Sequence, residues 1–449
     1  MKSLFLTTRF FLLLAALITG FVVAFFLPSL LGPMQVALGL LVVLAALDVL
    51  LLYAPGANGG GQVFGRRVMG EKLANGSDND IAIYLENRYR FAVHTETIDE
   101  IPHQFQRRDV LFRAALKAGE TQVIRYQLRP TKRGEYSFGA VNVLVASPLG
   151  LVRRRFRYDQ GQLVPVYPSF LQMRQYELLA ISNRLTEVGV KRIRRVGQSM
   201  EFEQIRPYVA GDDPRNINWK ATARRAGTGG DTLVVNHFQD ERAQQVYCLI
   251  DKGRVMRMPF HGLSLLDYAI NATLVVSNIA LLKHDKAGLL TFANKLSALV
   301  PAERRSGHLR KLLEVLYRQR TKYLETSFET LYTAVKTNIR QRSLLILFTN
   351  FETLSGMQRQ LPYLRRLAKD HLLLVVFFEN TELHQFLNTP AQTTEEVYNQ
   401  TIAEKFAQEK RQIVLELQRH GMHALLTAPE QLTVNTLNRY LEFKARGLI

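Results

Sequence analysis

The densest group of side chains that could do chemistry lies between residues 206 and 220, around the only tryptophan of the chain, Trp219. The other members of the group alternate in charge: Arg206, Asp212, Asp213, Arg215, Asn216 and Lys220. Such a group can dock a protein partner or bind an anionic ligand. It can also form an ion-paired brace that fixes this segment to a neighbouring sheet. We favour the brace, because networks of alternating charge often have that structural role.

The local sequence predicts a short helix that presents part of this group. Asp213 is expected to cap its N-terminus, and Pro214 to occupy its first position. Asn216, Lys220 and Arg224 would then lie in one row, at positions i, i+4 and i+8. The tryptophan would face another side and could pack against a sheet.

The motifs of common enzyme classes do not occur in the sequence. It contains no GxxxxGK[ST] phosphate-binding loop, no HExxH zinc motif and no GxSxG nucleophile motif. His420 and His423 lie close together, but no third metal ligand is evident beside them. Cys248 is the only cysteine, which excludes an internal disulfide and a cysteine-based zinc site. We therefore predict a protein that is not an enzyme and has no cofactor, with Cys248 as an inert core residue.

Positive charge dominates the composition, with 58 Lys and Arg against 39 Asp and Glu and a formal net charge of +19. Strongly basic proteins commonly bind phosphate, either on nucleic acid or on anionic lipid. We predict no nucleic-acid partner, because the sequence shows no recognised reading motif or aromatic platform. The basic cluster at residues 191–195 could contact anionic lipid or form a solvated loop, and both alternatives remain open.

Two apolar runs near the N-terminus, residues 10–27 and 34–53, are each long enough to cross a membrane. A bilayer core of about 30 Å takes roughly 20 apolar residues. The short break between the runs predicts a transmembrane hairpin within residues 1–55, and no small-x-small cleavage site suggests a signal peptide. Basic residues flank the hairpin and none lies in its turn: Lys2, Arg9, Arg66, Arg67 and Lys72. The positive-inside rule therefore predicts an inner-membrane protein with both termini and the soluble domains in the cytoplasm.

Asp48 lies within the second apolar run. A carboxylate inside a bilayer is costly and can mark a functional site. Because Asp48 is only about one helical turn from the cytoplasmic end, we favour the simpler interpretation that its side chain reaches water.

The rest of the chain shows two patterns of secondary structure. Residues 56–170 contain short β-type stretches punctuated by Asn, Gly and Pro, which predicts a small antiparallel β-sandwich. Residues 243–449 alternate apolar runs with helical stretches. The predicted strands are residues 246–250, 288–292, 344–348, 372–378 and 422–426. This pattern predicts an α/β fold with an open, mostly parallel sheet covered by helices on both faces, whose ligands would lie beyond the carboxyl ends of the strands.

The segment between these patterns, residues 171–242, carries a long run that is typical of a known family. The run comprises Glu201-Phe202, Arg206-Pro-Tyr, Gly211-Asp-Asp-Pro-Arg-Asn-Ile-Asn-Trp and Thr222-Ala-Arg-Arg. It resembles the signature of the family called domain of unknown function 58 (DUF58). Further similar features are the hairpin, the Arg133-Gly-Glu-Tyr turn, Ser147-Pro-Leu-Gly-Leu and the ending Tyr440-Leu-Glu-Phe.

The resemblance implies a β-sandwich followed by a von Willebrand factor A-like domain. It also implies a MoxR-type AAA+ ATPase as partner, because genes of the two families tend to be neighbours. The resulting hypothesis is a membrane-anchored cytoplasmic scaffold or adaptor that binds a protein partner.

The same resemblance implies where a metal ion would bind. Von Willebrand A domains often hold Mg²⁺ at an Asp-x-Ser-x-Ser loop after the first strand, completed by a Thr and an Asp from later loops. Here the loop is Asp251-Lys252-Gly253-Arg254-Val255, so glycine and valine replace both serines. Thr326 or Ser327 would supply the later hydroxyl, and Asn350 replaces the later aspartate. We expect a degenerate metal site and metal-independent binding; the alternative is a metal-dependent ligand-binding or enzymatic domain.

Overall fold

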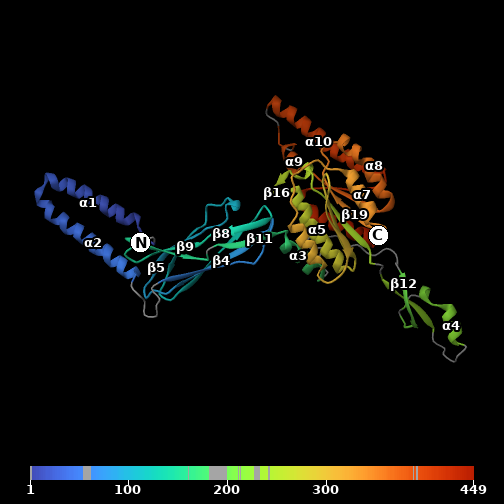
Figure 1. Cartoon of the computed structure of the whole chain (residues 1–449), viewed down its shortest axis with the longest axis horizontal. Helices are drawn as coiled ribbons and strands as arrows, with labels where there is room; N and C mark the ends of the chain where they lie inside the picture. Colours follow the sequence, from blue (N-terminus) through green and yellow to red (C-terminus); the bar gives the residue numbers. More distant parts are fainter. Residues whose placement is uncertain are drawn as a thin grey trace. The chain divides into compact units, whose positions relative to one another are not determined.

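The computed structural model describes residues 3–53, 62–159, 161–181, 200–210, 212, 214–226, 233–240, 243–387, 389–390 and 393–448. The chain divides into two compact units, Met1–Tyr167 and Pro168–Ile449. Unit 1 contains two N-terminal apolar helices and a β domain, and unit 2 contains an α/β domain (Figure 1). The prediction of a mixed α/β protein with two apolar N-terminal helices is thus confirmed.

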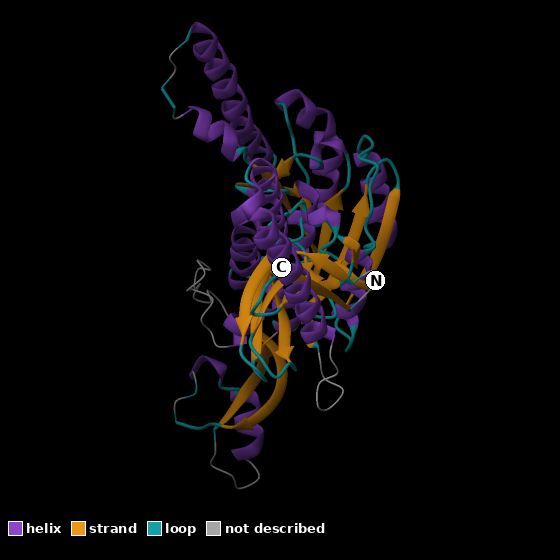
Figure 2. Cartoon of the chain, turned by 90° about the vertical axis from the view of Figure 1, so that its left-hand side faces the viewer, coloured by secondary structure: helices purple, strands orange, loops and turns teal. Residues whose placement is uncertain are grey.

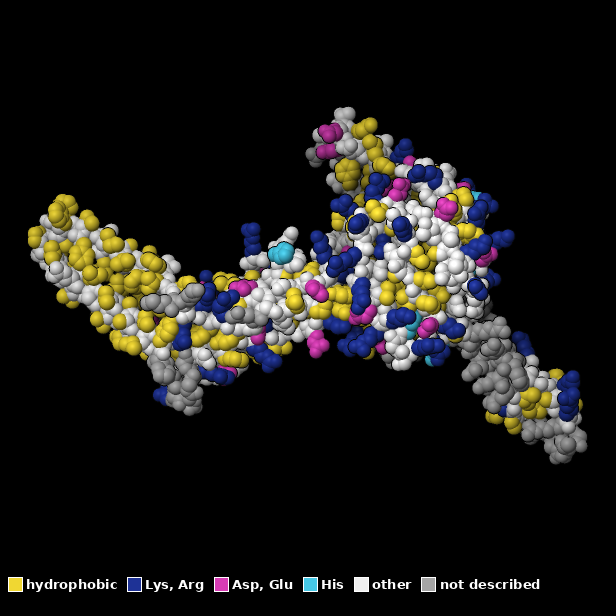
Figure 3. Space-filling view, in the orientation of Figure 1, with side chains coloured by type: hydrophobic (Ala, Val, Ile, Leu, Met, Phe, Trp, Pro, Cys, Tyr) yellow, Lys and Arg dark blue, Asp and Glu magenta, His cyan; other side chains and the backbone are white. Residues whose placement is uncertain are grey.

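Unit 1 begins with the two apolar helices. α1 spans Thr8–Phe26 and α2 spans Leu31–Tyr53, and the 3-10 turn Pro28–Leu30 joins them. Thr7 caps α1, because its side-chain oxygen accepts a hydrogen bond from the backbone N–H of Phe10 (3.4 Å). Hydrophobic side chains cover most of the surface of this helix pair (Figure 3). Both helices are long and apolar enough to cross a membrane, which supports membrane anchoring.

The β domain of unit 1 is built from three sheets. The first has the order β1 (Leu4–Leu6), β10 (Val152–Tyr158), β9 (Val141–Ala146), β5 (Val93–Asp99) and β6 (Leu111–Leu116). The second is β2 (Val63–Val68), β4 (Asn79–Asn87) and β7 (Thr121–Leu128), and the third is β3 (Leu73–Ala74), β11 (Gln162–Tyr167) and β8 (Gly134–Phe138). Ile83 and Leu85 of β4 pack in one core with Val143 and Val145 of β9. The first two sheets are both antiparallel, and because they share this core they pack face to face as a sandwich.

β1 is an element that the sequence pattern does not predict. It precedes α1 and pairs antiparallel with β10, with Leu4 opposite Arg154 and Leu6 opposite Val152. β2 follows α2 and belongs to the same β domain. Because the chain leaves this domain for α1 and returns to it after α2, two membrane spans would keep both flanks of the hairpin on one side of the bilayer.

Asp48 of α2 is buried, so the expectation that it reaches water is wrong. Its carboxylate accepts hydrogen bonds from the hydroxyl of Ser147 and from the backbone N–H groups of Leu151 (2.8 Å) and Val152 (2.8 Å). Nearby, the hydroxyl of Thr7 donates to the carbonyl oxygen of Leu151 (3.1 Å). Three donors compensate for the desolvation of the carboxylate, which thereby fixes α2 to the turn before β10.

Arg67 does not support the predicted membrane orientation, although it is one of the basic residues that flank the hairpin in the sequence. It lies on β2, is buried, and its guanidinium pairs with the carboxylate of Asp99 on β5. It also donates to the carbonyl oxygen of Gly139 (3.0 Å). A side chain in the interior of the β domain cannot face a membrane surface, so the orientation prediction depends on the other flanking basic residues.

A six-stranded sheet forms the centre of unit 2. Its strands lie in the order β18 (Leu296–Glu303), β17 (Lys286–Phe292), β14 (Gln245–Asp251), β19 (Leu344–Phe348), β20 (Leu372–Phe378) and β21 (His423–Thr427). Neighbours are parallel except for the antiparallel pair β17–β18. The five parallel strands are those that the apolar runs predict. The sequence pattern does not predict β18, because this strand is partly exposed and contains Pro301. A proline is tolerated there because β18 is an edge strand.

Helices cover both faces of this sheet (Figure 2). One face carries α3 (Phe170–Ile181), α5 (Leu265–Leu282), α6 (His308–Tyr317) and α11 (Leu432–Ala445). The other carries α7 (Phe328–Asn338), α8 (Leu354–Asp370) and α10 (Thr394–Arg419). Cys248 and Ile250 of β14 face the first core, and Tyr247 and Leu249 face the second. Burial on both faces explains why the strands are continuous apolar runs.

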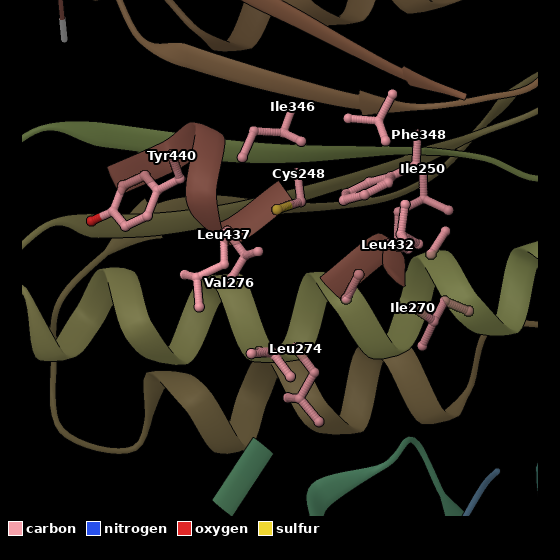
Figure 4. Close-up of a cluster of buried hydrophobic side chains, with 14 of the residues drawn as sticks. Cys248, Ile250, Ile270, Leu274, Val276, Ile346, Phe348, Leu432, Leu437 and Tyr440 are labelled. Atoms are coloured by element: carbon pink, nitrogen blue, oxygen red, sulfur yellow. The ribbon is translucent and has the colours of Figure 1, made fainter. Parts of the chain in front are cut away.

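The first core contains Cys248 and α5 (Figure 4). Burial raises the pKa of the Cys248 thiol to about 12, as expected of an inert core residue. α5 is also long and apolar enough to cross a membrane, but 78% of its apolar window is buried inside the structure. Its hydrophobicity therefore serves the core, where Val276 lies beside Leu437 of α11 and Ile270 lies near Leu432, the first residue of that helix.

Between α3 and β14 the chain forms a two-stranded arm. β12 (Met200–Pro207) and β13 (Val234–Asp240) pair antiparallel, and Figure 2 shows them as a ribbon with a helix at its end. That helix is α4 (Trp219–Ala226), which follows a 3-10 turn at Pro214–Asn216. We call the described residues from 200 to 240 the arm.

Candidate functional site

The carboxyl ends of the central strands bring together the residues that the family resemblance assigns to a metal ion. Asp251 is the last residue of β14, and Asn350 lies two residues after the end of β19. β14 and β19 are parallel neighbours, so these ends meet at one edge of the sheet. Thr326 reaches the same edge from the loop before α7.

The carboxylate of Asp251 is fully buried and already has protein partners. Its Oδ1 accepts hydrogen bonds from the hydroxyl of Thr326 (2.7 Å) and the backbone N–H of Gly253 (2.7 Å). Its Oδ2 accepts one from the hydroxyl of Thr349 (2.7 Å). Burial raises the pKa of Asp251, and these three hydrogen bonds oppose the shift.

Gly253 stands where the metal-binding motif has its first serine. A Cβ added at Gly253 would lie 1.8 Å from Oγ1 of Thr326 and 3.0 Å from Oδ1 of Asp251. A serine therefore cannot enter while Thr326 holds Asp251. In this chain the threonine hydroxyl takes the space beside the carboxylate that a motif serine would need.

Asn350 has a cation as its neighbour. Its Oδ1 accepts a hydrogen bond from Nζ of Lys410 (3.1 Å), and its Nδ2 donates to the carbonyl oxygen of Val255 (3.4 Å). Lys410 comes from α10 and also donates to the carbonyl oxygen of Phe378 at the end of β20. Burial lowers the pKa of Lys410 to about 8, and the negative charges of Glu352 and Glu379 partly oppose this shift.

This set of donors does not fit a divalent cation. Mg²⁺ requires several oxygen ligands, commonly carboxylates. Here Asp251 supplies the only carboxylate among the implied ligands, both of its oxygens already accept hydrogen bonds from the protein, and the oxygen of Asn350 faces an ammonium group that would repel a dication. Within the described residues no group of three or more His, Cys, Asp or Glu side chains could hold a metal ion. These contacts instead hold together the loop after β14, the loop after β19 and the loop before α7.

We predict that Lys410 makes the stability of unit 2 depend on pH in the alkaline range. Its folded pKa of about 8 lies below its ordinary value of 10.5, so between these values the unfolded chain binds more protons. The free energy of unfolding should therefore rise with pH, by roughly 2 kcal/mol between pH 8 and pH 10. Well below pH 8 both the folded and the unfolded state are protonated at Lys410, so the free energy of unfolding no longer changes with pH through this group.

The measurement is denaturant unfolding of the full-length protein at several pH values, compared with Lys410→Met. The variant removes the titrating group, so the difference in unfolding free energy between the two proteins should change across this window. Parallel pH profiles would contradict the prediction.

The predicted partner-binding group lies on the arm. Arg206 of β12 donates to the carboxylate of Asp212 (2.7 Å), which also accepts a hydrogen bond from the backbone N–H of Val209 (3.0 Å). These two residues thus brace the turn of the arm itself. Asp213 lies outside the described residues.

The prediction that the helix begins at Pro214 is wrong. Residues Pro214–Asn216 form a separate 3-10 turn, and α4 begins at Trp219. Asn218 caps α4, because its Oδ1 accepts a hydrogen bond from the backbone N–H of Ala221 (2.9 Å). Asn216 therefore lies outside the helix that carries Lys220. Trp219 is 67% exposed, so it does not pack against a sheet as predicted.

Two residues of the strand edge were not among the sequence-based candidates. Thr349 directly follows the predicted strand 344–348, so the rule that strand ends carry polar ligands could have found it. Lys410 gives no such signal, because it is one lysine among many on a helix and contacts Asn350, 60 residues away, only in the folded chain.

A known protein family matches a segment of the chain that contains most of the arm and most of the central sheet. Residues 204–386 match the family model described as "Protein of unknown function DUF58". This confirms the predicted resemblance for that part of the chain. The DUF58 match begins within β12 and ends within α9 (Thr381–Leu387), so it includes the arm from residue 204 onward and the strand-edge residues Asp251, Thr326, Thr349 and Asn350, whereas Lys410 lies beyond it.

A relative of the chain is the uncharacterized protein YeaD of Bacillus subtilis (strain 168), which is 28% identical over 134 residues. The alignment covers 29% of this chain and 31% of YeaD, so the chain spans about a third of the length of that relative.

Similar solved structures include an aerotolerance-related membrane protein of Bacteroides fragilis and BatB of Bacteroides thetaiotaomicron. Each is 11% identical, covers 45% of this chain and 98% of its own, and has a TM-score of 0.26. A PapD-like domain of human CEP192 is 13% identical, covers 24% of this chain and 86% of its own, and has a TM-score of 0.18. These TM-scores are too low to support any conclusion about the structure or function of this chain.

Proposed function

We propose that this protein is a membrane-anchored scaffold or adaptor. Its α/β domain, of von Willebrand factor A type, would bind a protein partner without a metal ion and without catalysing a reaction. The observation that carries the proposal is the strand edge. Asp251 is held by Thr326, Thr349 and the Gly253 amide, and Lys410 lies against Asn350. An edge filled with protein donors supports recognition by surface contacts rather than by metal coordination.

The anchor supports a defined location. The α1–α2 hairpin would hold the protein in a bacterial inner membrane, with both termini and the soluble domains in the cytoplasm. Pairing of β1 with β10 supports the placement of both hairpin flanks on one side, and the basic residues outside the spans support the cytoplasmic side.

The partner is proposed from the family resemblance. A MoxR-type AAA+ ATPase is the leading candidate, because DUF58 genes tend to neighbour genes of that ATPase family. The chain itself has no phosphate-binding loop, so an ATPase partner would supply the nucleotide chemistry that this chain lacks.

The test is affinity purification of the tagged full-length protein from native membranes in mild detergent, with and without a chelator. Mass spectrometry identifies the proteins that co-purify. A stoichiometric AAA+ ATPase that persists in chelator supports the adaptor. Loss of that ATPase on chelation would instead support the metal-dependent alternative, and the absence of any such ATPase in both conditions would overturn the proposed partner.

A further inference from the structure

An exposed apolar row lies along α10, next to the strand edge. Tyr398, Ile402 and Phe406 recur every four residues, so their side chains lie on one side of the helix. They are 67%, 38% and 44% exposed, and we call them the α10 stripe. Lys410 is the next residue of the same row and is mostly buried against Asn350. The stripe therefore begins where α10 leaves the body of the α/β domain.

The helix that carries the stripe is well formed. Thr393 and Glu396 make a reciprocal capping box at its N-terminus. The side chain of Gln400 donates to the carbonyl oxygens of Phe386 (3.3 Å) and Thr389 (2.5 Å), which ties the end of α9 to α10. Phe386 is itself exposed beside this contact. A row of large apolar side chains on an ordered helix marks a surface that buries them against something else.

Beside the N-terminal part of the stripe the charge is opposite to that of the chain as a whole, and the first basic residue along α10 is Lys405, next to Phe406. Residues 379–404 contain no Lys or Arg, and their acidic residues are Glu379, Glu382, Glu395, Glu396 and Glu404. Figure 3 shows acidic side chains together with hydrophobic ones over the end of α10. Glu395 lies three residues before Tyr398 and so borders the stripe. Anionic lipid and nucleic acid would be repelled here, so the surface suits a basic, apolar protein element.

The arm carries an element with that chemistry. Residues 214–226 contain no Asp or Glu, and their basic residues are Arg215, Lys220, Arg224 and Arg225. Lys220 and Arg224 are exposed one turn apart on α4, beside the exposed indole of Trp219. Cations and an indole can contact the carboxylates and aromatic rings of the α10 stripe through ion pairs and cation–π contacts.

We propose that α4 of one copy docks on the α10 stripe of a second copy, so that this protein assembles head to tail. Within the described residues of unit 2, α4 packs on β13, whereas α10 packs on α8, α9 and β21. The two complementary surfaces thus belong to different parts of the same unit. Anchoring in one membrane plane raises the effective concentration of the copies. A contact between two different surfaces produces a ring if it closes and an open array if it does not.

The test uses two variants of the full-length protein, each with its own tag. The stripe variant carries Glu395→Lys and Phe406→Ser, and the arm variant carries Trp219→Ser and Lys220→Glu. Each variant alone should lose self-association by about tenfold or more, since each removes an aromatic anchor and a charge. Mixed together they should associate again as pairs, because one supplies an intact arm and the other an intact stripe.

The readouts are the mass of the protein in detergent by light scattering and co-purification of the two tags from membranes. Matched controls are Glu329→Lys, another exposed first-turn glutamate, and Leu415→Ser, an exposed apolar residue on the opposite side of α10. Both should associate like the native protein. A native protein that is monomeric at tens of micromolar, variants that keep their association, or a mixture that fails to restore it would each overturn the proposal.

Discussion

Replacing Asp48 with leucine should destabilise unit 1, although leucine is the better residue for a membrane span. The substitution leaves the amides of Leu151 and Val152 and the hydroxyl of Ser147 buried without their acceptor. Each orphaned group costs about 1–3 kcal/mol, so we expect a loss of roughly 3 to 5 kcal/mol in the free energy of unfolding. A hydropathy argument alone predicts the opposite sign, because a carboxylate in a span costs about 3 kcal/mol.

The measurement is thermal unfolding of the full-length protein in detergent, followed by circular dichroism, with protease cleavage of the turn at residues 147–151 as a local readout. Ser147→Ala removes one of the three donors to Asp48, together with the acceptor of the Leu149 and Gly150 amides, and should cost about 1–2 kcal/mol, less than Asp48→Leu. Leu50→Ala, at an exposed position of the same helix, controls for changes in the helix itself. If Asp48→Leu proves as stable as the native protein, the carboxylate does not fix the hairpin to the β domain.

Replacing Asp251 with alanine should destabilise unit 2 by about 3 kcal/mol. The substitution removes the acceptor of three hydrogen bonds in a fully buried place, and at least the Gly253 amide cannot find another. Asp251→Asn keeps the shape and part of the accepting capacity, so its loss should be smaller. Thr349→Val removes one donor at nearly constant volume and should cost about 1 kcal/mol.

The same unfolding experiment, repeated with millimolar Mg²⁺ or Mn²⁺, separates a structural carboxylate from a metal ligand. We expect no shift in the melting temperature of the native protein, since both oxygens of Asp251 have protein donors. A metal-induced stabilisation that Asp251→Ala abolishes would instead favour the metal-dependent alternative. Glu329→Gln, at an exposed position, serves as the charge control and should behave like the native protein.

Local patterns made several elements predictable. The two apolar helices of the hairpin are long enough and apolar enough to cross a membrane, and the five parallel strands of unit 2 are continuous hydrophobic runs because helices cover both faces of their sheet. The loss of the motif serines at Gly253 and Val255 is visible in the sequence by simple comparison with the family motif. These features need no knowledge of distant residues.

Elements that are short or exposed could not be predicted from local hydrophobic patterns. β1 has only three residues and exists because β10 offers it an edge to pair with. β18 carries a proline and has no continuous apolar run. α4 begins at Trp219 because Asn218 provides its cap, and the preceding Pro214 forms a turn of its own. In each case several residues could start or end the element, and the local sequence does not rank them.

By itself, the sequence determined which segments are apolar enough to cross a membrane and which form the central strands of the α/β core, since both leave a continuous run of hydrophobic residues along the chain. Only the tertiary structure decided the partners of the buried polar groups. Asp48 meets Ser147 99 residues away, Asp251 meets Thr349 98 residues away, and Asn350 meets Lys410 60 residues away. The physical reason is that a hydrogen bond depends on the positions of two atoms in space, and those positions are fixed by the packing of elements that the local sequence encodes separately.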